Sequence, residues 1–289
     1  MSIEDVMSAV NRWLVATEAL AAVGAELTLA RGQDPADPAV SDALRAVPAA
    51  AGLGDLSELA PPQREMVISL VRMALRQAQD LLDDPGRAPG WAFTDPDILQ
   101  GWGRGSMLIP AALAAQVPEL AQVRSFLDVG TGIGLLAVAA ARTWPDAAIT
   151  GIDVWPPSLR MAEDNIRAAG LADRVVLRQQ DVAALDDENA YDCVWFPTFF
   201  VTEPVLTTAT ARLVRSLRVG GWLVLGRMPA PPDPLAGAVT TLRTIRAGGS
   251  NFEPKQLASV LEDAGCANVR VVPRQGPMTL EYVIGQRSA

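Results

Sequence analysis

From Val123 to the end of the chain, short apolar runs alternate with segments of helical periodicity. We expect strands at residues 125–129, 147–152, 174–177, 191–196, 222–226, 269–272 and 280–284. Helices are expected between them, at residues 134–143, 157–169, 205–217 and 254–264. This alternation predicts an α/β fold, a mainly parallel sheet with helices on both faces. Only a short loop containing Gly276 and Pro277 separates the last two strands, so we expect them to pair antiparallel.

The first third of the chain has the pattern of helices without strands. Apolar residues recur at helical spacing from Ile3 to Leu20, and turn-forming residues at 32–38 end this segment. A second helix is expected over 62–82, and a third begins with Asp95 as its cap and Pro96 at its first position. We therefore predict a helical cap or dimerisation domain at 1–90, connecting helices and a lid at 91–122, and the α/β core at 123–289.

The complete absence of histidine from the 289 residues removes several kinds of chemistry. It excludes a Ser-His-Asp or Cys-His catalytic unit and any metal site that uses imidazole, and we expect no metal. The two cysteines, Cys193 and Cys266, are far apart and are interpreted as small buried apolar residues. Acid–base chemistry must therefore come from carboxylates, tyrosine, the single lysine Lys255 or the substrate.

The charge balance limits the partners of the chain. There are 24 Lys and Arg against 33 Asp and Glu, which gives a net charge of −9. Nucleic-acid binding draws on clustered basic residues, so a small molecule is expected instead. The longest uncharged stretch, residues 105–118, is too short to span a membrane. Since the N-terminus is acidic where a secretory signal would be basic, we expect a cytoplasmic protein with no membrane partner.

The sharpest local signal is a glycine-rich turn between an expected strand and an expected helix. Asp128 ends the strand region, and Gly130, Gly132 and Gly134 follow it at alternate positions. Glycine suits a tight turn that a ligand approaches closely, beside the free N–H groups of a helix start. The third glycine stands one position too early for the dinucleotide pattern G-x-G-x-x-G.

Four further motifs follow this turn in order along successive strands. Asp153 ends the second strand, where a carboxylate can accept hydrogen bonds from both hydroxyls of a ribose. Asp181 follows the third strand, where it could meet an exocyclic amine. Residues 192–198 form the end of the fourth strand and the turn after it, and Gly220 with Gly221 precedes the fifth strand.

This constellation resembles the class I S-adenosylmethionine-dependent methyltransferases of the small-molecule, natural-product type, over roughly residues 123–289. The resemblance implies a Rossmann-like seven-stranded sheet with one antiparallel strand, and S-adenosylmethionine as cofactor with S-adenosylhomocysteine as product. It implies that the glycine turn holds the amino-acid end, Asp153 the ribose and Asp181 the adenine amine, with Trp155 against the adenine. The cofactor-binding residues predicted in this way are Asp128, Gly130, Thr131, Gly132, Gly134, Asp153, Val154, Trp155, Asp181, Val182 and Phe196.

The resemblance also gives weaker expectations about the acceptor. Phe199 and Phe200 follow the fourth strand, where the family binds its acceptor, and Glu203, Tyr282 and Arg104 are candidate catalytic or anchoring polar groups. The helical first third is expected to cover the acceptor and to form a homodimer.

Methyl transfer from a sulfonium is an in-line displacement that depends mainly on alignment and exclusion of water. A base is needed only when the attacking atom is a poor nucleophile at rest. Without histidine, we favour C- or N-methylation of an already nucleophilic centre, such as an indole carbon, on a small aromatic or hydrophobic metabolite. The alternatives are O-methylation with a carboxylate or tyrosine base, a nicotinamide-dependent oxidoreductase, and a non-catalytic cofactor-binding module.

Overall fold

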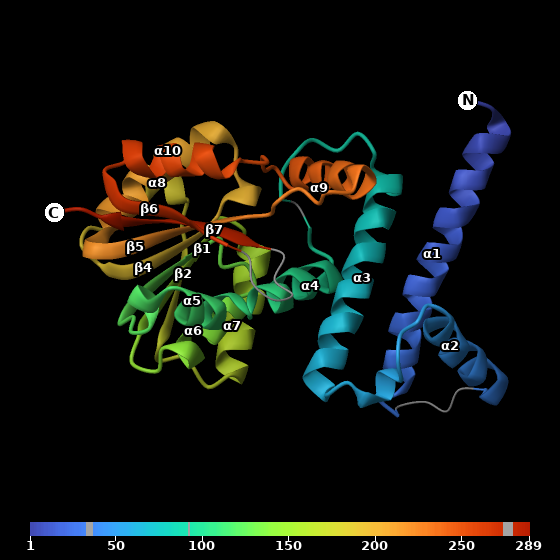
Figure 1. The fold of residues 1–289 in the computed structure, drawn as a ribbon. Coiled ribbons are helices and arrows are strands. Elements are labelled where there is room, and N and C mark those ends of the chain that lie inside the picture. The colour runs from blue at the N-terminus through green and yellow to red at the C-terminus, as the bar shows by residue number, and fades with distance from the viewer. Residues whose placement is uncertain (33–36, 92, 274–279) are drawn as a thin grey trace. The chain divides into compact units, whose positions relative to one another are not determined.

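A computed structural model of the chain describes residues 1–32, 37–91, 93–273 and 280–289 (Figure 1). The described residues divide into two compact units. One consists of Met1–Pro85 and Asp95–Trp102, and the other of Gly86–Thr94 and Gly103–Ala289. The division into domains at residues 90 and 122 stays a prediction, because spatial compactness does not test which parts fold or act on their own.

The second unit is built on a seven-stranded sheet with the order β3-β2-β1-β4-β5-β7-β6. Strand β7 pairs antiparallel with both β5 and β6, and the other strand pairs are parallel. This confirms the predicted fold class and the antiparallel last pair; the loop residues Gly276 and Pro277 lie outside the described residues. The strands are β1 (Ser125–Val129), β2 (Ala148–Asp153), β3 (Val175–Gln179), β4 (Tyr191–Pro197), β5 (Leu217–Arg227), β6 (Cys266–Val272) and β7 (Glu281–Arg287).

Helices cover both faces of this sheet, as Figure 1 shows. Helices α8 and α10 lie over one face, where a continuous apolar cluster includes Val194, Phe196 and Leu225. Helices α6 and α7 lie over the opposite face of β1, β2 and β3. The helices of this unit are α5 (Ile109–Gln116), α6 (Leu135–Thr143), α7 (Pro156–Ala168), α8 (Glu203–Ser216), α9 (Pro234–Arg246) and α10 (Pro254–Asp263), with short 3-10 turns η2 (Pro118–Leu120), η3 (Val182–Ala184) and η4 (Thr198–Phe200).

The first unit is helical, and local caps define its elements. Ser2 and Asp5 form a reciprocal capping box at the start of α1 (Ile3–Leu29). Asp37 caps α2 (Pro38–Ala50) through the amides of its first turn. Helix α3 (Pro61–Asp83) packs closely on α1, where a side chain in place of Gly24 would lie 2.9 Å from Val71. A short turn, η1 (Leu56–Glu58), precedes α3.

Helix α4 (Pro96–Ser106) begins in the helical unit and ends in the sheet unit. Asp95 accepts a hydrogen bond from the Asp97 amide at 2.8 Å, which confirms the predicted cap. Arg76 lies 3.6 Å from Asp95, an ion pair that holds the start of α4 beside α3. No described helix is both long enough and apolar enough to cross a membrane.

Three local features differ from the sequence prediction. Helices α2 and α9 were not predicted, whereas α5 lies within the segment 91–122 that was predicted as connecting helices. The two-glycine turn lies inside β5 rather than before it, where Gly220 has a φ of 83° beside a register shift in the pairing with β4. Cys193 is buried as predicted, but Cys266 is only half-buried because β6 is the edge strand of the sheet.

Candidate active site

The glycine turn joins β1 to α6 and requires glycine at three positions. Gly130, Gly132 and Gly134 have φ values of 69°, 56° and 75°, in the region that other residues rarely adopt. The amides of Gly130 and Thr131 donate to the carbonyl oxygen of Ile152 at 2.9 and 3.0 Å. The turn is thereby fixed to the end of β2, with its backbone partly exposed at the carboxyl edge of the sheet.

Asp153, the last residue of β2, lies directly against this turn. Its carboxylate accepts hydrogen bonds from the amides of Gly132 and Trp155, both at 2.8 Å. Burial raises the pKa of Asp153 above its usual value, although these amide bonds act in the opposite direction. A carboxylate has about four lone-pair sites, so two accepted bonds leave capacity for a ligand's hydroxyl groups.

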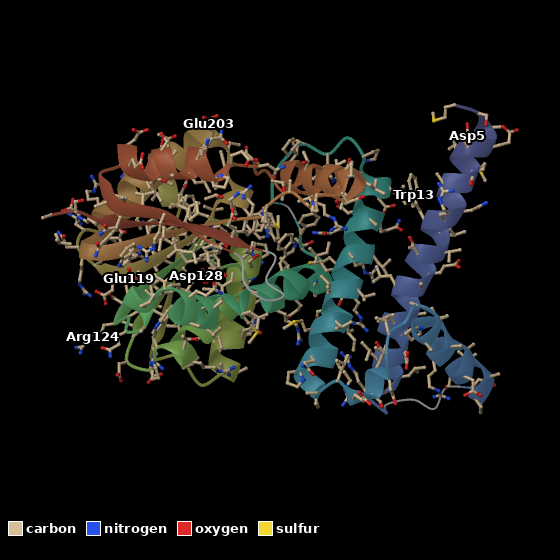
Figure 2. All side chains as sticks on the ribbon, viewed as in Figure 1. Asp5, Trp13, Glu119, Arg124, Asp128 and Glu203 are labelled. Carbon is tan, nitrogen blue, oxygen red and sulfur yellow. The ribbon has the colours of Figure 1, made fainter. Side chains whose placement is uncertain are left out.

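Asp128 lies beneath the turn and is 1% exposed. The hydroxyl of Thr131 donates to its carboxylate at 2.7 Å. Burial raises the pKa of Asp128 to about 7; the Thr131 bond opposes this shift and the nearby charge of Asp153 adds to it. Figure 2 shows Asp128 inside the sheet unit. The edge therefore holds two desolvated carboxylates, which favours a ligand with positive charge.

The other predicted cofactor residues lie at the ends of neighbouring strands. Val154 is 59% exposed, and Trp155 precedes α7 as its half-buried N-cap. The amide of Gln180 donates to the backbone oxygen of Asp153 at 2.9 Å, which holds the turn after β3 beside β2. Asp181 in that turn is exposed and caps η3 through the amide of Ala183, at 2.8 Å.

Two of the predicted cofactor residues are turned away from open surface. Val182 is 9% exposed and Phe196 is 1% exposed, and both belong to the apolar cluster. Only their backbone can therefore lie along a ligand. The contacts thus bring Asp128, Thr131, Gly132 and Asp153 together directly, with the turn after β3 next to them.

The end of β4 continues from the glycine turn into a row of aromatic rings. A side chain at Gly130 would lie 3.6 Å from Pro197, the last residue of β4. Phe199 and Phe200 follow in η4, with ring centroids 4.5 Å apart. The ring of Trp91 lies 5.1 Å from that of Phe200 and 5.3 Å from that of Phe93. Trp91 and Phe93 were not predicted to lie here, since they precede the core by some thirty residues and stand out only as two aromatic residues beside the linker.

The three candidate polar groups are not brought together. Glu203 is exposed at the first position of α8, and Figure 2 shows it well apart from Asp128. Tyr282 is 2% exposed beside the ring of Trp195, and its hydroxyl has no hydrogen-bond partner among the described residues. Burial raises the pKa of Tyr282 to about 12. Arg104 is half-buried, and within the described residues its Nε likewise has no partner.

Comparison with known proteins finds relatives for the segment that contains the glycine turn and the strands after it. Residues 126–221 match the family model of a methyltransferase domain. The chain is 28% identical over 179 residues to a tRNA1(Val) (adenine(37)-N6)-methyltransferase from a Flavobacteriaceae bacterium, covering 55% of this chain and 77% of that protein. It is 24% identical over 179 residues to the S-adenosyl-L-methionine-dependent methyl transferase PigF from Serratia sp., and the match covers 59% of this chain and 50% of PigF.

A third relative is the 3-hydroxy-5-methyl-1-naphthoate 3-O-methyltransferase of Streptomyces sahachiroi, 26% identical over 189 residues, with 63% of this chain and 54% of that protein covered. Two solved structures match along nearly the whole chain. An O-methyltransferase family protein from Burkholderia thailandensis has a TM-score of 0.72 at 19% identity, covering 100% of this chain and 99% of that one. PigF with S-adenosylhomocysteine has a TM-score of 0.67 at 19% identity, covering 99% and 100%.

The fold, the glycine turn and the family match together define the class. Residues 126–221 are a methyltransferase domain within a Rossmann-like sheet of class I order. The match confirms the resemblance that the motifs carry, to the S-adenosylmethionine-dependent methyltransferases, over residues 126–221. A nicotinamide-dependent oxidoreductase does not fit this match.

Proposed function

We propose that the protein methylates a small aromatic or hydrophobic metabolite, at a carbon or nitrogen that is already nucleophilic at neutral pH. S-adenosylmethionine supplies an electrophilic methyl group and carries an ammonium and a sulfonium charge. The site fits this ligand, because the desolvated pair of Asp128 and Asp153 lies at a glycine turn with open backbone. In this proposal Asp153 accepts bonds from the ribose, Asp181 from the adenine amine, and Trp155 packs on the adenine.

The protonation states of the candidate polar groups carry the preference for an acceptor that needs no base. With a pKa of about 12, Tyr282 keeps its proton at neutral pH, so it can donate a hydrogen bond but not remove a proton. Arg104 is a permanent cation. Glu203 is an exposed carboxylate that the structure shows apart from Asp128. Alignment of the acceptor and exclusion of water therefore supply the catalysis.

O-methylation is the second candidate, and the names of the relatives favour it. A naphthoate 3-O-methyltransferase and a mitomycin 7-O-methyltransferase are among the similar proteins. On this chain, Glu203 or another carboxylate would take the proton of the acceptor hydroxyl. The relative that acts on tRNA shares the same domain, but a net charge of −9 disfavours a nucleic-acid substrate here. A cytoplasmic protein of specialised metabolism fits these properties.

Methyl transfer from labelled cofactor to a panel of indoles, amines, carboxylic acids and phenols tests the function. We expect turnover of an indole or an aromatic amine, which are uncharged near neutral pH. At saturating cofactor the rate should be flat across the neutral pH range. Exclusive turnover of unactivated phenols, with a rate that rises with pH, would contradict the base-free proposal and support O-methylation.

We also propose a homodimer formed through α1. Of the 27 residues in this helix only Gly24 and Leu27 are buried, and the first half presents large apolar side chains to solvent. A contiguous apolar face of this kind marks an interaction surface. The residues of this face are Ile3, Val6, Met7, Val10, Trp13 and Leu14, exposed by 36% to 67%; Figure 2 shows Trp13 on this helix.

The oligomeric state of a charged variant tests the homodimer. The double substitution Trp13→Arg and Leu14→Arg is expected to convert a dimer into a monomer in light scattering after size-exclusion chromatography. As a control, the double substitution Leu235→Arg and Leu242→Arg introduces the same two charges at exposed positions of α9 and should leave the mass unchanged. A wild-type protein that is monomeric at micromolar concentration would contradict the proposal.

A further inference from the structure

Helix α7 packs one of its faces against the glycine turn between β1 and α6. The side-chain amide of Asn165 donates to the carbonyl oxygen of Ile133 at 2.9 Å. One turn earlier in the helix, Ala162 lies so close that a side chain at Gly134 would meet its Cβ at 3.0 Å. Ala162 and Ile133 are buried, Asn165 is half-buried, and all belong to the same compact unit. Asn165 therefore reaches from α7 into the turn.

The hydrogen bond from Asn165 completes the fixation of one peptide group. The peptide between Ile133 and Gly134 donates through its N–H to the carbonyl oxygen of Thr131 at 2.9 Å, and its C=O accepts from Asn165. Rotation of a peptide group changes ψ of the residue before it and φ of the residue after it. Gly134, with a φ of 75°, tolerates either sign of φ, so it does not prevent such a rotation. The bonds to Thr131 and Asn165 prevent it instead.

The orientation of this peptide decides what the turn presents to a ligand. Gly134 is the N-cap of α6, and no described side chain caps this helix. The amides of its first turn have no partner inside the helix, and they attract an anionic group. A carbonyl oxygen rotated toward them would place negative partial charge in the same space, on a turn that already touches the carboxylates of Asp128 and Asp153. The bond from Asn165 keeps that oxygen on the side of α7.

We propose that Asn165 is a positioning residue for the cofactor, which holds the Ile133–Gly134 peptide so that the turn can accept the amino-acid carboxylate of S-adenosylmethionine. The inference rests on the proposed function, since that function places the amino-acid end of the cofactor at the turn. Asn165 does not touch the cofactor and acts through the carbonyl group of Ile133. The nucleoside end depends on Asp153, which is joined to the turn by the Gly132 amide instead. Loss of Asn165 should therefore affect one end of the ligand.

Two ligands that differ only at the amino-acid end test this role by isothermal titration calorimetry. The probes are S-adenosylhomocysteine and 5′-methylthioadenosine, which share the nucleoside and the thioether sulfur; the second carries a methyl group in place of the amino-acid chain. Asn165→Ala should weaken S-adenosylhomocysteine binding roughly fivefold and leave 5′-methylthioadenosine binding within about twofold. Asn165→Asp keeps the shape but turns an oxygen toward the Ile133 carbonyl, so it should weaken S-adenosylhomocysteine binding at least as strongly.

Two further variants serve as controls. Glu163→Ala changes an exposed position of the same helix and should leave both affinities unchanged. Asn165→Gln retains the side-chain amide and should bind S-adenosylhomocysteine more tightly than Asn165→Asp. Thermal unfolding followed by circular dichroism establishes that each variant is folded at the temperature of the titration. If Asn165→Ala is unfolded there, the comparison of Asn165→Gln with Asn165→Asp decides the question.

The remaining outcomes overturn the inference in ways that can be told apart. Unchanged S-adenosylhomocysteine affinity in Asn165→Ala and Asn165→Asp means that the peptide keeps its orientation without Asn165. Equal weakening of both probes means that Asn165 only stabilises the packing of α7. Failure of the wild-type protein to bind S-adenosylhomocysteine overturns the cofactor site of the proposed function, and the role of Asn165 with it.

Discussion

The cofactor edge and the row of aromatic rings after β4 are built in contrasting ways. At the cofactor edge, Asp128, the glycine turn and Asp153 come from the ends of two adjacent strands and are joined by hydrogen bonds of 2.7 to 3.0 Å. In the ring row, residues 86–94, 198–200 and 246–249 meet through glycine contacts and ring edges. The edge is fixed by directional polar bonds, and the row by close packing.

The difference also concerns charge. The cofactor edge contains two carboxylates whose pKa values are raised by burial, whereas the ring row consists of four uncharged rings with the guanidinium of Arg87 4.9 Å from the centroid of Phe93. Changes at the edge should therefore alter cofactor affinity and pH dependence, and changes in the row should alter stability without altering cofactor affinity. The predictions below test this separation, from the largest expected effect to the smallest.

Asp128→Asn should have the largest effect, on the stability of the protein without cofactor. The folded state holds the Asp128 proton more tightly than the unfolded state, so stability is lost as pH rises from 3.8 to about 7. The full loss in the free energy of unfolding is on the order of 4 kcal/mol. Asparagine does not ionise, so the variant should keep its stability as pH rises. We expect urea unfolding curves of the variant and wild type to agree near pH 4 and to diverge in favour of the variant at pH 8.

An exposed carboxyl group provides the control for this experiment. Asp146 lies on the surface before β2, and Asp146→Asn should leave the pH dependence of unfolding unchanged. If the free energy of unfolding has the same pH dependence in Asp128→Asn and the wild type, ionisation of Asp128 does not destabilise the folded protein.

Asp153→Ala should weaken S-adenosylmethionine binding by about 2 kcal/mol or more, roughly 30-fold, in isothermal titration calorimetry. The substitution removes the proposed ribose acceptor and the brace on the Gly132 amide. Unchanged cofactor affinity would mean that the ribose lies elsewhere.

Gly249→Ala changes the packing beneath the ring row and leaves the cofactor edge intact. The added methyl group would lie 1.9 Å from the Phe199 carbonyl oxygen, so η4 must shift, at a cost of about 1 to 3 kcal/mol in stability. We expect this loss in urea unfolding curves, with S-adenosylhomocysteine affinity within about twofold of wild type. Gly105→Ala is the matched control, since no atom lies within 4 Å of its added methyl group. Loss of cofactor affinity in Gly249→Ala would show that the cofactor edge and the ring row are coupled.

Asp181→Ala should have the smallest effect, about 1 kcal/mol or roughly fivefold in cofactor affinity. The side chain is exposed and caps η3 through Ala183. Asp181→Ser separates two explanations, because serine preserves the cap but not a charged acceptor for the adenine amine. If serine restores full affinity, Asp181 acts only by holding the turn after β3.

The contrast between the cofactor edge and the ring row explains what the sequence could predict. The alternation of strands and helices, the antiparallel last pair and the cofactor edge all depend on short local patterns, such as glycines at alternate positions or an aspartate at a strand end. The φ values of Gly130, Gly132 and Gly134 confirm why no other residue stands there. Local patterns therefore predicted how this edge is built, and its role in holding the cofactor stays a prediction.

The ring row could not be predicted in the same way. Phe199 and Phe200 were candidates because they follow a strand, but Trp91 lies more than a hundred residues earlier and meets them only through tertiary packing. The close approach of Gly249 to Phe199 likewise has no signature in either segment. The degree of burial of each ring could not be predicted either. The sequence does not show that Phe196 belongs to the apolar cluster while Phe200 is only half-buried.

The interleaved units have a consequence for recombination between related enzymes. The chain enters the sheet unit for residues 86–94, returns to the helical unit for 95–102 and then leaves it again. A crossover near residue 122 would replace the helical part together with Trp91 and Phe93, and would transplant half of the ring row from another parent. A crossover near residue 85 would keep the row intact. We expect the packing of the rings to be disturbed in hybrids of the first kind and preserved in hybrids of the second kind.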